Sequence, residues 1–97
     1  MKLRWLARAQ RHLIEIHAYI AADNKKAAQK VIQRIQAASP LLTRHAQAGR
    51  AGRVDGTREF PIPGTPYLIV YRIHSKEVQI LAIQHGAQQW PDDVPQK

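Results

Sequence analysis

Five polar side chains in the second half of the chain belong to residue types that occur in RNA-cleaving sites. They are Arg58, Glu59, Arg72, His74 and His85. Cleavage of RNA requires a base that activates a 2′-hydroxyl, a cation that stabilises the pentacovalent phosphate and an acid that protonates the leaving oxygen. Histidine, arginine and glutamate can fill these roles when they lie close to one phosphate. A ribonuclease site is therefore one interpretation, and it depends on the elements that position these residues.

Two apolar segments, residues 67–74 and 78–85, are predicted to form the hairpin that carries most of these side chains. If Ser75-Lys76 is a two-residue turn, the pairing runs back from the turn and sets Tyr71 opposite Ile80 and Leu68 opposite Ile83.

This pairing also predicts the distance between the catalytic candidates. His85 lies opposite Pro66, six residues along the strand from Arg72. At about 3.3 Å per residue this separation is roughly 20 Å. The two side chains cannot act on the same phosphate. We therefore favour no catalytic site, and a ribonuclease site built from His85, Arg58 and Arg72 is the alternative interpretation. A histidine before glycine also suits a hydrogen-bonding anchor for the next loop.

The predicted hairpin is apolar on both faces. One face is expected to pack on helices through Tyr67, Ile69, Tyr71, Ile73, Val78, Ile80 and Ala82. The second face carries an apolar patch of Leu68, Val70, Leu81 and Ile83. An antiparallel sheet with two apolar faces needs two covers. The C-terminal segment or another protein could supply the second one, and we favour a partner protein.

The first half of the chain is predicted to be helical. Residues 2–5 alternate like a short edge strand, and apolar residues then recur at helical spacing from Leu6 to about Ala22. Asp23 and Asn24 are good caps for a second, antiparallel helix that continues to Ala38. A short helix beginning at Ser39-Pro40 and a strand near residues 57–62 complete an α+β fold. We expect one domain over residues 1–97, with a polar tail at 92–97.

Basic residues are concentrated in the first half. The chain has 15 Lys and Arg against 7 Asp and Glu, and residues 1–53 hold eleven basic and two acidic side chains. A net charge of +8 favours an anionic partner or simply keeps the surface soluble. The candidate target-binding residues are Arg8, Arg11, Arg50, Arg53 and Trp90.

Three of these candidates have a structural alternative as well. Arg50 and Arg53 each follow a glycine, and they either contact a phosphate or an acidic target, or pair with Asp55 or Glu59. Trp90 either closes the core or anchors a partner.

Several classes of protein are not expected. There is no cysteine, so no disulfide or thiolate zinc site can form, and His12, His17 and His45 lack metal-ligand spacing. We expect no metal and no cofactor. No apolar run of 18 residues is present, which indicates a cytoplasmic protein without a membrane partner.

A series of motifs resembles one family. They are Gly49-Arg50, Gly52-Arg53, Thr57-Arg58-Glu59, residues 66–72, His85-Gly86 and Trp90-Pro91. In this order, after a helical hairpin, they are similar to the RelE/ParE superfamily of toxins from bacterial type II toxin-antitoxin modules. The resemblance implies a cognate antitoxin whose tail covers the toxin, and contact with operator DNA only through the antitoxin.

The superfamily has two activities, and the resemblance to its ParE-like branch is favoured. RelE-like members are ribonucleases that cut mRNA on the ribosome, whereas ParE-like members poison DNA gyrase. RelE-like enzymes tend to carry an arginine near the start of the strand where this chain has Pro66, Tyr67 and Leu68, and their C-termini carry Arg or Tyr groups. The favoured partner is therefore gyrase, the ribosome with mRNA is the alternative, and a non-toxic interaction or nucleic-acid-binding domain is the third interpretation.

Overall fold

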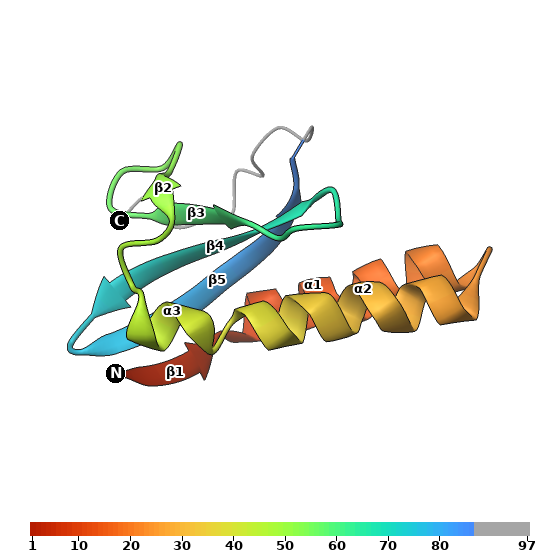
Figure 1. The fold of residues 1–97 in the computed structure, drawn as a ribbon, viewed down its shortest axis with the longest axis horizontal. Helices are drawn as coiled ribbons and strands as arrows, with labels where there is room; N and C mark the ends of the chain where they lie inside the picture. Colours follow the sequence, from red (N-terminus) through yellow and green to blue (C-terminus); the bar gives the residue numbers. More distant parts are fainter. Residues whose placement is uncertain (87–97) are drawn as a thin grey trace.

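A computed structural model of the chain, which describes residues 1–86, contains a five-stranded sheet with two long helices along one face (Figure 1). The strand order is β1-β5-β4-β3-β2. The elements are β1 (Lys2–Trp5), α1 (Ala7–Ala21), α2 (Lys25–Ala38), α3 (Leu41–Arg44), β2 (Arg50–Ala51), β3 (Arg58–Pro61), β4 (Tyr67–His74) and β5 (Glu77–His85). The predicted α+β class is confirmed, and Trp90 and residues 92–97 lie outside the described part.

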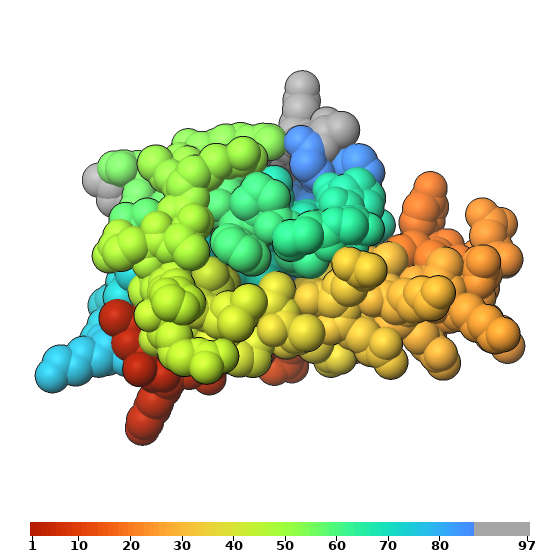
Figure 2. Space-filling model, viewed as in Figure 1, coloured from red at the N-terminus to blue at the C-terminus, as the bar shows by residue number. Residues whose placement is uncertain are grey.

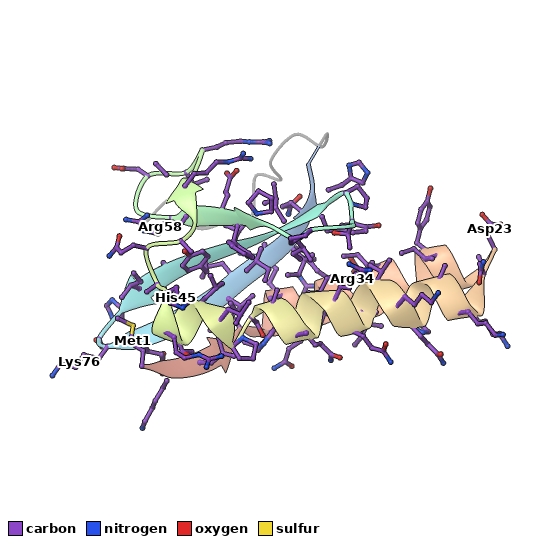
Figure 3. The ribbon with its side chains drawn as sticks, viewed as in Figure 1. Met1, Asp23, Arg34, His45, Arg58 and Lys76 are labelled. Atoms are coloured by element: carbon purple, nitrogen blue, oxygen red, sulfur yellow. The ribbon has the colours of Figure 1, made fainter. Side chains whose placement is uncertain are left out.

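The antiparallel hairpin of α1 and α2 forms as the apolar spacing predicts. Asn24 caps α2 by accepting a hydrogen bond from the Ala27 amide at 3.0 Å. The turn at Asp23 projects beyond the sheet (Figures 1 and 3). Ser39 does not cap α3, because its hydroxyl donates to the Gln36 carbonyl at 3.1 Å. The helical hairpin therefore lies against the sheet along its middle and at the end next to α3, while the turn lies outside the sheet.

The main core lies between the hairpin and the sheet. Ile35 and Leu42 from the helices and Ile69, Tyr71 and Ile80 from the strands are all completely buried there. Arg34 of α2 adds a polar tie, because its Nη1 donates to the Pro63 carbonyl at 3.3 Å (Figure 3). The helices and the central strands are thus held to each other along most of α2.

The β4–β5 hairpin matches the prediction only near its turn. Ser75 and Lys76 both have positive φ, 53° and 59°, as a two-residue hairpin turn requires. Tyr71 pairs with Ile80 as predicted, but Ile83 pairs with Ile69 rather than with Leu68. An irregularity after Val70 inserts one extra residue into β5, and such a bulge reverses the side-chain alternation beyond it.

The bulge changes which side chains share a face. Ile83 belongs to the helix-facing core, whereas Ala82 lies in a second cluster with Leu68, Val70 and Leu81. Leu6, just before α1, packs against this second cluster. The predicted second-face patch is therefore wrong for Ile83 and for Ala82, which exchange places.

The outer strands complete the sheet. β1 runs parallel to β5, with Leu3 and Trp5 packed against the core as predicted. The two-residue strand β2 was not predicted, and it pairs antiparallel with β3 so that Arg50 lies opposite Glu59. Figure 2 shows the segment around β2 and β3 as a corner that stands away from the helices.

Candidate functional site

His85 lies apart from the other two candidate catalytic residues, whereas Arg58 pairs with Tyr71, the neighbour of Arg72 on β4. His85 ends β5 opposite Tyr67, and Arg72 lies opposite Gln79, five residues further along β4, which is roughly 17 Å. The bulge also puts His85 and Arg72 on opposite faces of the sheet. His85 pairs with Tyr67, which packs on the helix-side core, whereas Arg72 is an odd number of residues from Tyr67 and so lies on the other face. His85 makes an edge-on ring contact with Tyr67 at 5.6 Å between centroids.

Arg58 is used in the fold. Its Nη1 donates to the Gly49 carbonyl at 2.7 Å, and its Nη2 donates to the side-chain oxygen of Gln47 (Figure 3). Arg72 donates from Nε to Gln79 Oε1 at 2.7 Å. Each of the two arginines is thus tied to a different neighbouring segment, and neither shares a site with His85.

Tyr71 anchors the segment between α3 and β2. Its hydroxyl donates to the Ala46 carbonyl and accepts from the Gly49 amide, both at 2.8 Å. Burial raises the pKa of Tyr71, and this effect outweighs the lowering by the Gly49 hydrogen bond and by Arg58. Gly49 has to be glycine, since a Cβ there would lie 2.6 Å from the Tyr71 hydroxyl oxygen. The entry to β2 is therefore fixed to the sheet core.

A buried carboxylate joins Arg50 and Arg53. Glu59 is only 2% exposed. Its Oε1 lies 3.4 Å from Arg50 Nη2, and its Oε2 accepts from the Arg53 amide at 2.9 Å and lies 3.8 Å from Arg53 Nε. Arg53 Nη2 also donates to the Gly86 carbonyl at 3.3 Å. The predicted pairing of these arginines with Glu59 is confirmed, while most of the Arg50 side chain remains exposed.

The other basic candidates lie on α1. Arg11 is exposed, with its Nε 4.0 Å from Glu15 on the next turn, and Arg8 is half-buried. An exposed pair of this kind contributes little to stability. Both residues remain predictions as target contacts.

Leu68, Val70 and Leu81 are almost completely buried, and with Ala82 they form the second apolar cluster. Their role in binding an antitoxin remains a prediction, and Ile83 no longer belongs to this surface.

A cavity of about 530 Å³ at the far end of the β4–β5 hairpin was not predicted. It is lined by His12, Glu15, Ile16, Tyr19, Tyr67, Ile83, Gln84 and His85. His12 Nδ1 accepts a hydrogen bond from the Ile83 amide at 3.2 Å. Burial, and secondarily Tyr19, raise the pKa of Tyr67. The spacing of residues 12, 15 and 19 puts them on one helix face, which is the signal that could have indicated this cavity.

An apolar groove of about 380 Å³ runs along the outer face of the helical hairpin. Its lining residues are Gln10, Leu13, Ile14, His17, Ile32 and Gln36. Ile14 is 70% exposed in this groove, and Tyr19, on the same helix, is 80% exposed.

Within residues 1–86 no group of histidine, aspartate and glutamate side chains is arranged to hold a metal ion. None of the helices in this part of the chain has the length and apolar character that a membrane span requires.

Known proteins similar to this chain fall in one family. The family model of the ParE toxin of type II toxin-antitoxin systems, parDE, matches residues 3–90. Y4kP of Sinorhizobium fredii, a candidate toxin by name, is 46% identical over 90 residues, 93% of each chain. The solved chromosomal ParDE system from P. aeruginosa includes a chain that is 31% identical with a TM-score of 0.80, covering 88% of this chain and 95% of that one.

This chain therefore belongs to the ParE toxin family. The expected superfamily and its favoured branch are confirmed.

Proposed function

We propose that this ParE-family toxin inhibits growth by poisoning DNA gyrase, which blocks replication, and that a cognate antitoxin neutralises it. The observation that supports gyrase over the ribosome is the separation of His85 from Arg58 and Arg72. Acid–base cleavage of RNA needs these groups around one phosphate. A toxin that acts by binding needs only exposed surfaces on a rigid scaffold. Its place of action is then the cytoplasm.

The antitoxin is proposed to cover the apolar surface of the toxin. The similar solved chain from P. aeruginosa belongs to a chromosomal ParDE toxin-antitoxin system. Two candidate surfaces lie within residues 1–86: the groove at Ile14, which is exposed, and the second cluster of Leu68, Val70 and Leu81, which is almost completely buried and would be reached only at its edge. Repression of the operon would follow from operator binding by the antitoxin part of the complex. Hydrogen exchange on the complex would test the placement, because protection at neither surface would contradict it.

Induction of the toxin alone in bacteria tests the target. We expect cleaved gyrase–DNA complexes, an SOS response and filamentation, and rescue of growth when the cognate antitoxin is co-expressed. Rapid arrest of translation with cut transcripts would instead establish the ribonuclease alternative. Normal growth without the antitoxin would leave only a non-toxic interaction domain.

His85→Ala is expected to leave toxicity intact. The imidazole contacts Tyr67 at the end of β5 and is roughly 17 Å along the strands from Arg72. If His85 were a general acid or base, its removal would lower activity about 10²- to 10⁴-fold. Growth inhibition at matched expression is the measurement, with the exposed turn variant His74→Ala as control. Loss of toxicity in a folded, antitoxin-binding His85→Ala protein would contradict the proposal.

A further inference from the structure

The corner formed by β2 and the loop that follows it carries two arginines held by one buried acid. We propose that Arg50 and Arg53 form an arginine fork, oriented by Glu59, that binds the phosphates of a DNA backbone directly. The inference deepens the proposed function, since it makes the DNA held by gyrase a second contact of the toxin. Its first test, however, needs no gyrase.

The geometry of the fork is fixed by Glu59. Each carboxylate oxygen has a different arginine within 4 Å, and Oε2 also accepts the Arg53 amide. A carboxylate that is 2% exposed is stable only when its oxygens are paired, so it constrains both guanidinium groups. The two groups are thereby held near one point of the surface rather than spread over it.

The loop that carries the fork is itself rigid. The Gly52 amide donates to the Thr57 carbonyl at 2.8 Å, and the Thr57 amide and hydroxyl both donate to the Val54 carbonyl, at 3.1 and 2.6 Å. Tyr71 fixes the preceding Gly49. Because the backbone is bonded on both sides of the fork, the arginines lose less conformational entropy on binding than free surface arginines do.

The charges of the corner favour an anion. The Arg50 and Arg53 side chains are 60% and 44% exposed, and residues 50–59 carry three positive charges, Arg58 included, against the negative charges of Asp55 and Glu59. Arg58 is not part of the fork, because it is adjacent to Glu59 in β3 and its side chain therefore leaves the strand on the opposite face. Guanidinium groups bind phosphate in a planar, two-pronged geometry that lysine cannot reproduce. We assign phosphate rather than an acidic protein because a gyrase poison acts where DNA backbone is exposed and the chain carries a net charge of +8.

The decisive test keeps the net charge and removes the geometry. Binding of a fluorescein-labelled duplex of about 30 base pairs, a length of the order of a DNA-binding site, is measured by anisotropy at low salt. Arg50→Lys with Arg53→Lys should weaken binding about tenfold, the equivalent of one charge-assisted hydrogen bond.

The salt dependence of binding tests the charge itself. Arg50→Gln with Arg53→Gln should weaken binding and also lower the slope of log K against log salt concentration by about 1.8, or about 0.9 for each phosphate that is no longer neutralised. Lys26→Gln with Lys30→Gln, an exposed pair on α2, is the matched control and should leave the slope unchanged.

Glu59→Gln separates orientation from charge. It makes the chain more positive, so a surface that attracts DNA only by its charge would bind more tightly. The fork predicts weaker binding, because the carboxylate that orients the arginines has been replaced by a neutral amide. Circular dichroism and thermal unfolding show whether Glu59→Gln folds. If it does not fold, DNA binding by the Arg50→Lys, Arg53→Lys variant decides whether the fork geometry matters.

The fork would be overturned by no binding of the parent protein, by equal binding of the Arg50→Lys, Arg53→Lys variant, or by tighter binding of folded Glu59→Gln. Binding of an acidic peptide in place of DNA would also overturn it and would assign the corner to a protein partner. If DNA binding follows the fork but gyrase is not poisoned, the proposed function fails and the fork stands. If gyrase is poisoned equally by parent and fork variants, the proposed function stands alone.

Discussion

Tyr71→Ala is expected to lower the free energy of unfolding by about 3–5 kcal/mol, the range for removing a large buried aromatic ring. Tyr71 is completely buried in the helix-side core and is among the largest fully buried side chains of the described residues. Its removal would leave a cavity and would also release Ala46 and Gly49. Since typical domains are stable by only about 5–15 kcal/mol, much of the native population would be lost near growth temperature.

Tyr71→Phe divides this effect into packing and hydrogen bonding. It keeps the ring and leaves the Gly49 amide and the Ala46 carbonyl without the hydroxyl, at an expected cost of about 1–3 kcal/mol. Urea unfolding of the three proteins gives both values. A Phe variant as unstable as the Ala variant would show that the hydroxyl, and not the ring, holds this region.

Ile35→Ala is expected to destabilise the chain by about 2–5 kcal/mol, as for other large-to-small changes in a packed core. Ile35 lies on the sheet-facing side of α2 and has no exposed surface. Its side chain is part of the interface that holds the helices to the sheet, so a cavity there weakens both layers.

Ile14→Ala is the matched control for Ile35. Ile14 is also an isoleucine within a long helix but is 70% exposed, so the same truncation should change stability by no more than about 0.5 kcal/mol. Urea unfolding with equal m-values checks both variants. An equal loss of stability in the two proteins would mean that the outer groove is packed against something within the chain.

The sequence allowed most elements of the fold to be predicted, because their patterns are strong. The helix spacing predicts α1 and α2, and the alternation with the turn at Ser75 predicts the register near Ile80. The bulge gave no signal, because residues 80–83 are all apolar and no polar residue marks the change of face. β2 could not be predicted because a two-residue strand has no period to detect.

The candidate site was predictable only in part. Pairing of Arg53 with Glu59 was one of two interpretations, because a separation of six residues makes contact possible without requiring it. The depth at which Glu59 is buried depends on the completed sheet, which no local pattern reveals. The His12 cavity joins α1 to residues 48 or more positions later, so the spacing of residues 12, 15 and 19 could indicate only the α1 side of its lining.

The parallel pairing of β1 with β5 has a consequence for the timing of synthesis. Lys2–Trp5 is synthesised before the rest of the sheet, and its partner residues Glu77–Ile80 are made more than 70 residues later. Until then β1 has no strand to join, and α1 has no central strand to pack on. A nascent chain that stops short of β5 holds the helices and most of the positive charge without the sheet that organises them. The folded toxin therefore forms only after β5 has been synthesised.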